Sequence, residues 1–281
     1  MKTIRSVQEL KKLLADQRKL GSTVSFVPTM GAIHQGHLSL IELAKKQSDF
    51  VVASIFVNPL QFSSESDFDL YPKSEEADSA LLESAGADIL FLPSVDEVYP
   101  GGKMTNTHSA GPIGELYEGK SRKGHFDGML TVVARLFEIV KPDLAVFGVK
   151  DAQQLFLVRQ MTKQDNSIQI VEGPTIRDPN GLALSSRNQR LSAEQFEASL
   201  TLSKALVRAD QAAYSGLGPA TSIEEAISVF SANPEAKLEY LELVNPESFE
   251  PLEDGFKGQA LMIVAAEVGN VRLIDNRSIT F

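Results

Sequence analysis

The sequence predicts an α/β fold, in which a doubly wound parallel sheet is followed by a second, smaller α+β domain. Two observations support this prediction. Short apolar runs alternate with helical patterns up to about residue 162, as is typical of β-α-β units. After residue 187, two helical patterns precede three strand patterns instead. We therefore expect domains over residues 1–177 and 178–281.

Hydrophobic periodicity justifies the elements of the first domain. Ser6 and Glu9 form a capping-box pattern ahead of apolar residues at helical spacing, and Gly21 ends this helix. Segment 50–57 is almost entirely apolar, as a strand covered on both faces should be. The same criteria predict strands over residues 24–27, 50–57, 88–92 and 144–147, and helices over 37–47, 74–85, 126–140 and 151–162.

The second domain has a different texture. Helical patterns cover residues 192–214 and 222–231, and strand patterns cover 238–244, 260–268 and 271–274. Gly269 and Asn270 supply the turn between the last two strands. We expect a small α+β domain.

Composition restricts the class of partner. The chain has 281 residues, a formal net charge of −10 and no cysteine. The charge argues against a nucleic-acid partner, and the lack of cysteine excludes disulfides and thiolate metal sites. The polar N-terminus is unlike a signal peptide, and no apolar run approaches about 18 residues. We expect a cytoplasmic protein that acts on small molecules without binding a membrane.

The segment FVPTMGAIHQGH, residues 26–37, is the first candidate site. His34 and His37 lie about one turn apart at the start of a helix, and Gly36 removes a side chain between them. A helix N-terminus presents unpaired N–H groups and a positive dipole end, where imidazole donors add to phosphate binding. Two surface histidines are the simpler alternative. A zinc site is weaker, since only His108 and His125 remain as imidazole ligands.

Residues 148–154, GVKDAQQ, follow the strand predicted over 144–147 and open a helix. Lys150 can neutralise a phosphate oxygen, and Gln154 lies one turn further on the same side. Asp151 can accept hydrogen bonds from ribose hydroxyls, or simply cap the helix. An ordinary capped helix with solvated polar residues is the alternative.

Residues 184–188, LSSRN, follow a turn over 178–181. They place the hydroxyls of Ser185 and Ser186 and the guanidinium of Arg187 on what should be a mobile loop. Such a loop can close over the β- and γ-phosphates and supply positive charge in the transition state. By itself, this pattern would usually indicate an ordinary polar loop.

Two further polar clusters are candidates for binding a substrate. Asn58 and Gln61 end the strand over 50–57, and residues 118–125, with His125, precede the long helix. The Gln61 amide can both donate and accept, which suits a hydroxylated organic acid, although turn capping is equally compatible. The two clusters could share one cleft.

Five separated motifs, PTMGAIHQGH, NPLQF, ELYEGKSRKGHFDGMLTVV, VFGVKDAQQ and GLALSSRNQRLS, together resemble the pantothenate synthetase (pantoate–β-alanine ligase) family. The resemblance runs in order from about residue 26 to 191. It implies a Rossmann-like fold of the nucleotidylyltransferase group with an HxGH motif, in which the small C-terminal domain, residues 178–281, acts as a lid. It also implies phosphate contacts for His34, His37, Lys150, Ser185, Ser186 and Arg187, ribose contacts for Gly148 and Asp151, backbone contacts with the nucleotide for Met30 and Ile176, and pantoate contacts for Gln61 and Gln154.

The implied reaction joins pantoate to β-alanine with ATP through pantoyl adenylate, and His34, His37, Lys150 and Arg187 would be its catalytic residues. The resemblance also implies Mg²⁺ with ATP and a cytoplasmic homodimer, and the sequence names no metal ligands. Two other readings stay open at this point. One is an HxGH adenylyltransferase that acts on a phosphorylated acceptor, and the other is a nucleotide-responsive module without turnover.

Overall fold

A computed structural model describes residues 1–62, 74–102, 105–163 and 167–281. The chain divides into two compact units, one of residues 1–149 with 157–174 and the other of residues 150–156 with 175–281. We describe each unit by itself. The domain division at residue 177 remains a prediction.

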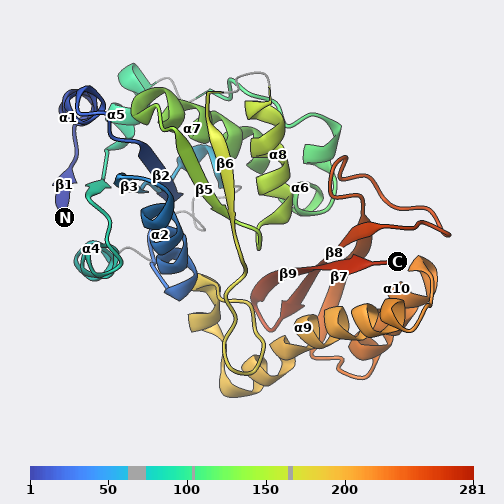
Figure 1. The fold of residues 1–281 in the computed structure, drawn as a ribbon. Helices are drawn as coiled ribbons and strands as arrows, with labels where there is room; N and C mark the ends of the chain where they lie inside the picture. The colour runs from blue at the N-terminus through green and yellow to red at the C-terminus, as the bar shows by residue number, and fades with distance from the viewer. Residues whose placement is uncertain (63–73, 103–104, 164–166) are drawn as a thin grey trace. The chain divides into compact units, whose positions relative to one another are not determined.

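The first unit is built on a six-stranded parallel sheet (Figure 1). Its strands, in spatial order, are β1 (Lys2–Ile4), β4 (Ile89–Phe91), β3 (Phe50–Ile55), β2 (Val24–Thr29), β5 (Leu144–Gly148) and β6 (Gln169–Gly173). The predicted parallel sheet is therefore confirmed. Successive residues of the central strand β2 point to opposite faces, because side chains alternate along a strand.

Helices cover both faces of this sheet. Phe26 of β2 packs edge to face on Phe137 of α7, whereas Val27 belongs to the apolar cluster under α2. Helix α7 contacts α1 and α5, and α2 contacts α4. The bounds are α1 (Val7–Lys19), α2 (Gln35–Gln47), α4 (Glu75–Ser84), α5 (Val95–Val98), α6 (Glu118–Ser121), α7 (His125–Val140) and α8 (Ala152–Thr162), with 3₁₀ turns η1 (Pro59–Gln61), η2 (Pro100–Gly102) and η3 (Pro112–Glu115).

Sequence patterning missed two strands, β1 and β6. Each lies at an edge of the sheet and pairs on one side only, β1 with β4 and β6 with β5. Their residues are mostly exposed or half-buried. An edge strand needs no continuous apolar run, so the signal that identified the central strands was absent here.

The start of α1 is correctly predicted, but its capping is not. Ser6 occupies the N-cap position without a side-chain capping hydrogen bond. Instead, the Val7 N–H donates to Glu97 Oε2 at 2.6 Å, and Glu9 pairs with Lys2. A carboxylate brought in by tertiary structure thus satisfies one of the orphan N–H donors at this helix start, although the local capping box does not form.

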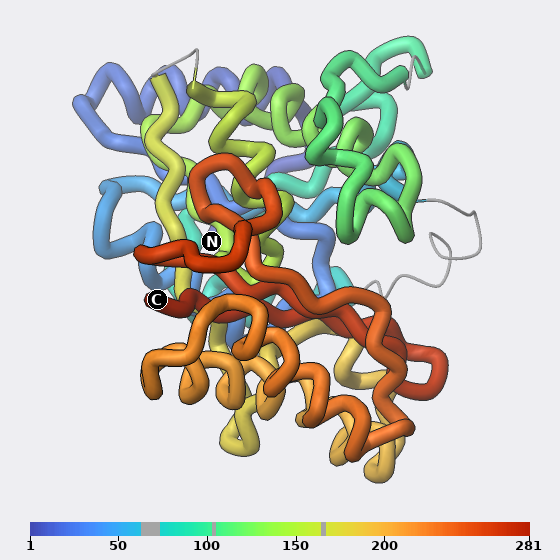
Figure 2. The backbone as a smooth tube through the Cα atoms, turned by 90° about the vertical axis from the view of Figure 1, so that its right-hand side faces the viewer, coloured from blue at the N-terminus to red at the C-terminus, as the bar shows by residue number. Residues whose placement is uncertain are grey.

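The second unit contains an antiparallel sheet of β7 (Ala236–Val244), β8 (Gln259–Val268) and β9 (Val271–Thr280), in that order. Helices α9 (Ala193–Tyr214) and α10 (Pro219–Ser231) lie along this sheet (Figure 2). A common apolar core joins them to it. The predicted α+β composition is confirmed. Strand β9 runs six residues beyond its predicted end at residue 274, because it pairs with β8 throughout.

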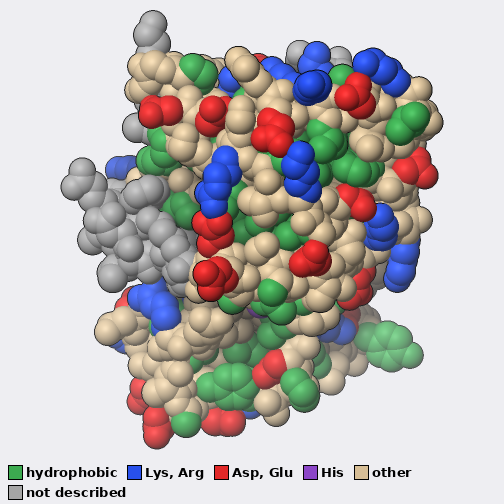
Figure 3. All heavy atoms as spheres, turned by 90° about the vertical axis from the view of Figure 1, so that its left-hand side faces the viewer, with side chains coloured by type: hydrophobic (Ala, Val, Ile, Leu, Met, Phe, Trp, Pro, Cys, Tyr) green, Lys and Arg blue, Asp and Glu red, His purple; other side chains and the backbone are tan. Residues whose placement is uncertain are grey.

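Charged side chains of both signs are interspersed on the face drawn in Figure 3. Among the described residues, exposed or half-exposed ion pairs include Lys45 with Asp88 and Arg159 with Glu172. None of the helices in the described ranges combines the length and hydropathy that a membrane crossing requires.

Candidate functional site

The candidate site segments of the first unit begin where its inner strands end, at the carboxyl side of the sheet. Met30 to His37 follow β2, Asn58 to Gln61 follow the neighbouring strand β3, and Gly148 ends β5 on the other side of β2. From β2 the chain continues to β3, whereas from β5 it continues to β6 in the opposite direction. This reversal is a topological switch point, where ligands of open parallel sheets bind beyond the carboxyl ends of the strands.

The segment between β2 and α2 is held by a buried carboxylate. Asp78 of α4 is 3% exposed and accepts hydrogen bonds from the N–H groups of Ala32 and Ile33, both at 2.8 Å. Gly31 and Ala32 have positive φ angles of 89° and 51°. A Cβ on Gly31 would lie 3.0 Å from Asp78 Oδ2, so this glycine is required for both conformation and space. The carboxylate therefore fixes the backbone that leads to His34.

His34 and His37 lie side by side at the start of α2, as predicted. Their ring centroids are 4.1 Å apart. His34 is the N-cap residue, and its Nδ1 accepts from the Gly36 N–H at 3.1 Å, while His37 Nδ1 accepts from the His34 N–H at 3.4 Å. Since Nδ1 is an acceptor in each ring, the neutral tautomer carries its proton on Nε2. Each imidazole is thus a donor through Nε2, next to the positive end of the α2 dipole.

Gln61 lies in a buried polar cluster at the end of β3. Its Nε2 donates to Met30 Sδ at 2.8 Å, and its Oε1 accepts from Asn58 Nδ2 at 3.2 Å. Asn58 is fully buried and also accepts from the Tyr99 hydroxyl at 2.9 Å. These contacts orient the Gln61 amide and place it beside the segment that follows β2.

The cluster around residues 118–125 joins Gln61, as the sequence suggested. His125 Nδ1 lies 2.8 Å from the Gln61 carbonyl oxygen, and His125 Nε2 lies 3.0 Å from Arg122 Nη1. Arginine can only donate, so Nε2 accepts and Nδ1–H donates to the carbonyl. A Cβ at Gly128 would lie 2.3 Å from the Leu60 oxygen, so only glycine allows α7 to approach the η1 turn this closely.

Tyr99 provides a pH test of this cluster. Burial raises the pKa of its phenol from 10.0 to about 12. The unfolded chain then loses this proton at lower pH than the folded protein, so the free energy of unfolding should fall between about pH 10 and 12. Two pKa units correspond to at most about 2.7 kcal/mol. Urea unfolding of the wild type and Tyr99→Phe across this range should show a shallower fall in the variant. Equal slopes would contradict the burial of a neutral phenol.

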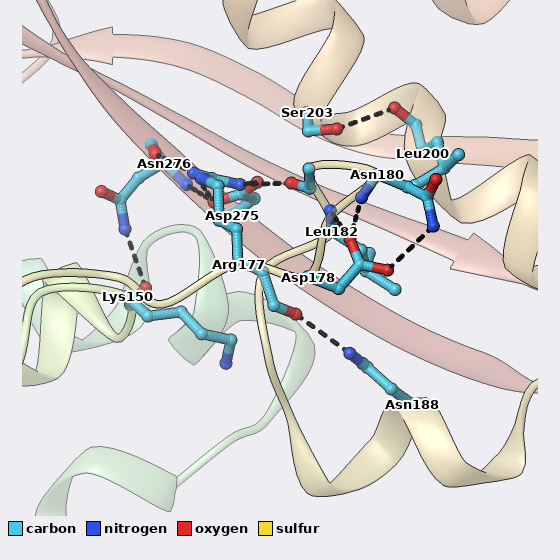
Figure 4. Close-up of polar contacts among 12 residues, drawn as sticks. Lys150, Arg177, Asp178, Asn180, Leu182, Asn188, Leu200, Ser203, Asp275 and Asn276 are labelled. Atoms are coloured by element: carbon cyan, nitrogen blue, oxygen red, sulfur yellow. Dashed lines mark hydrogen bonds and ion pairs between the residues drawn. The ribbon is translucent and has the colours of Figure 1, made fainter. Parts of the chain in front are cut away.

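The other predicted site residues belong to the second unit. They are Lys150, Asp151, Gln154, Ile176, Ser185, Ser186 and Arg187. Lys150 Nζ lies 3.8 Å from Asp151 Oδ1, and the Lys150 side chain is 17% exposed. Asp151 immediately precedes α8, and its carbonyl accepts the Leu155 N–H. Figure 4 shows that the Lys150 carbonyl is bound by Asn276 while the Lys150 side chain extends away from that bond.

Ser185 to Arg187 form the start of a 3₁₀ helix, η4 (Ser186–Arg190). Ser185 is its N-cap and accepts from the Arg187 N–H at 3.3 Å. Asn188 donates to the Ala183 carbonyl at 3.0 Å, and the Leu184 N–H donates to the Ile176 carbonyl at 2.9 Å. The segment expected as a loop is thus locally ordered by its own hydroxyl and amide groups.

Sequence analysis missed Asp78 and Tyr99. Neither follows a strand or belongs to a recognisable motif, so only tertiary contacts reveal their roles. Among the described residues, which include all four histidines, no three His, Asp or Glu side chains are grouped to hold a metal ion. The zinc alternative therefore has no support in this part of the chain.

The doubly wound sheet and its strand-end segments place the protein in the Rossmann-like class of α/β proteins. A sequence model described as pantoate-beta-alanine ligase matches residues 2–278. The chain belongs to the pantoate–β-alanine ligase family.

Individual relatives agree with this assignment. The chain is 47% identical to a pantothenate synthetase of a Nocardioides species over 96% of this chain and 82% of the relative. A crystal structure of pantothenate synthetase from Thermus thermophilus has a TM-score of 0.92 at 45% identity and covers 99% of both chains. A ligase from Francisella tularensis, complexed with beta-gamma ATP and beta-alanine, has a TM-score of 0.80 at 36% identity over 99% of this chain and 97% of that one.

Proposed function

We propose that this protein condenses pantoate with β-alanine at the expense of ATP, through a pantoyl-adenylate intermediate, and releases AMP and pyrophosphate. The observation that carries the proposal is the family match over residues 2–278, which contains every motif of the candidate site. This activity makes the enzyme an AMP-forming acid–amine ligase of pantothenate biosynthesis.

In the first step, a pantoate carboxylate oxygen attacks the α-phosphorus of ATP. The new P–O bond forms as the bond to the pyrophosphate oxygen breaks, and the electron pair leaves with pyrophosphate. A carboxylate with a pKa near about 4 is already ionised at neutral pH, so no base is needed. Catalysis at this step requires positioning and stabilisation of developing charge.

Each predicted residue receives a role in binding or catalysis in this proposal. His34 and His37 donate through Nε2 to phosphate oxygens, and Lys150 and Arg187 supply positive charge as pyrophosphate departs. Gln61 and Gln154 bind the hydroxyls of pantoate. The full assignment adds Ser185 and Ser186 on the phosphates, Gly148 and Asp151 on the ribose, and the backbone of Met30 and Ile176 beside the nucleotide.

In the second step, the amine of β-alanine attacks the acyl carbon of the mixed anhydride. The C–N bond forms, the bond between that carbon and the AMP oxygen breaks, and the amine gives up a proton to solvent or to a phosphate oxygen. Hydrolysis of the adenylate would waste ATP, so exclusion of water matters here. We assign that role to the segment from Ser185 to Asn188.

ATP is proposed to bind with Mg²⁺, which neutralises phosphate charge when present. Mg²⁺ keeps several waters and is often held largely by substrate phosphates, so a dedicated protein cage is not needed. We further propose a cytoplasmic homodimer that binds neither nucleic acid nor membranes. Sedimentation of the purified protein tests the dimer directly.

Pantoate-dependent exchange of pyrophosphate into ATP tests the proposed function. Exchange should require pantoate and proceed without β-alanine, and adding β-alanine should release AMP and pantothenate. Exchange supported equally by a phosphate ester would favour the alternative adenylyltransferase. ATP binding without any exchange would favour the regulatory module and overturn the proposal.

A further inference from the structure

We propose that Asn276 of β9 is a positioning residue for Lys150. Its amide Nδ2 donates to the Lys150 main-chain carbonyl at 2.8 Å, although 126 residues separate them in sequence. The inference rests on the proposed role of Lys150 at the phosphates of ATP. Strand β9, which sequence patterning indicated only as a structural element, thus receives a part in the chemistry.

Asn276 is itself held by an ion pair whose carboxylate is buried and whose guanidinium is partly exposed. The Arg177 guanidinium binds Asp275 with two hydrogen bonds, Nη1 to Oδ2 at 2.6 Å and Nη2 to Oδ1 at 2.8 Å. The Asp275 side chain is only 2% exposed. Asp275 Oδ1 also accepts the Asn276 N–H at 2.8 Å, and Arg177 Nη2 donates to the Asn276 carbonyl at 3.3 Å. Both polar groups of the Asn276 backbone are therefore bound by this pair.

The same ion pair anchors the segment that leads to Ser185. Arg177 Nη1 donates to the Gly181 carbonyl at 3.0 Å, and Arg177 pairs with Ala183 across an antiparallel bridge. Within this turn, Asp178 Oδ1 accepts the N–H groups of Asn180 and Leu182. The turn then continues into Ser185 and η4. Two adjacent residues of β9 thus connect to Lys150 on one side and to the phosphate-binding segment on the other.

This arrangement favours positioning over simple stabilisation. Desolvation of the buried Asp275 carboxylate offsets much of its attraction to Arg177, so the pair adds little net stability, but its bidentate geometry fixes orientation. The Asn276 side chain donates to the main-chain carbonyl of Lys150, which is the residue proposed to supply the positive charge. Displacement of a catalytic group by about 1 Å can cost on the order of 100-fold in rate. Asn276 is therefore expected to affect kcat through Lys150.

A double-mutant cycle in the full-length protein tests the inference. Asn276→Ala should lower the rate of pantoate-dependent pyrophosphate exchange about tenfold or more, with the KM for pantoate unchanged. In a Lys150→Ala background the same substitution should have no further effect, because the group that it positions is gone. Equal losses in both backgrounds would show a general structural role and overturn the inference, as would a wild-type rate in Asn276→Ala.

Two further variants keep the outcome interpretable. Asn276→Asp preserves shape but turns an oxygen toward the Lys150 carbonyl, so it should be at least as slow as Asn276→Ala. Asn270→Ala, at the exposed β8–β9 turn, should retain the wild-type rate. Absence of exchange in the wild type would count against the proposed function itself, whereas normal wild-type exchange with an unaffected Asn276→Ala would count against this inference alone.

Discussion

Lys150→Ala is expected to slow pantoyl-adenylate formation by about 10²–10³-fold while leaving the fold intact. The substitution removes a cation that we place at the phosphates, where charge grows as pyrophosphate leaves. Among the described residues, the ion-pair partner of the Lys150 side chain is Asp151 at 3.8 Å, so removal of this side chain should cost little stability. Single-turnover formation of the adenylate from ATP and pantoate measures the effect directly.

Two matched variants support this measurement. Lys163→Ala removes an exposed lysine just beyond the far end of α8 and should leave the rate unchanged. Lys150→Arg keeps the charge but changes its shape and reach, so it should recover only part of the rate. Near-normal adenylation by Lys150→Ala would remove Lys150 from the catalytic set.

Asp78→Ala is expected to combine a large loss of stability with a loss of activity. The N–H groups of Ala32 and Ile33 would lose their acceptor inside the protein. Each unsatisfied buried donor costs about 1–3 kcal/mol, which gives about 2–6 kcal/mol for the pair. The segment before His34 would also lose the contact that holds its two positive-φ residues. Urea unfolding gives the stability, and pyrophosphate exchange gives the activity.

Asp78→Asn separates the two effects. It retains one acceptor oxygen but presents an amide N–H to the second backbone donor, so it should fall between the wild type and Asp78→Ala in stability. Asp96→Ala, at an exposed aspartate of α5, should change stability by less than about 0.5 kcal/mol. Asp78→Ala with wild-type unfolding and exchange would rule out the proposed support of the His34 segment.

The paired histidines illustrate what could be predicted from local pattern. A strand end, a proline and an HxGH motif predicted a helix start with both rings on one side, and the rings lie 4.1 Å apart there. The prediction succeeded because residues three apart at a helix N-terminus are neighbours whatever the rest of the protein does. Gln61 and His125, by contrast, were only expected to share a cleft, and the hydrogen bond between them required α7 to pack on η1.

Capping at the starts of two helices shows the limits of such patterns. Ser6 and Glu9 match a capping box that does not form: Glu9 pairs with Lys2, and the distant Glu97 binds the Val7 N–H. Ser192 and Gln195 do form one at the start of α9. Local sequence is the same kind of signal in both cases, but in the first the tertiary structure gives Glu9 and Val7 other partners.

The sequence by itself determined the doubly wound sheet, the α+β second unit, the HxGH pair and the motifs that resemble the family, because these depend on periodicity and on neighbours within one turn of chain. Tertiary structure alone decided the edge strands β1 and β6, the Asp78 bonds behind His34, and the link from Asn276 to Lys150. The Asp78 bond to Ala32 spans 46 positions of sequence, and the Asn276 bond to Lys150 spans 126. A hydrogen bond across such a separation leaves no periodic trace in the chain, since its geometry exists only after the strands and helices have packed.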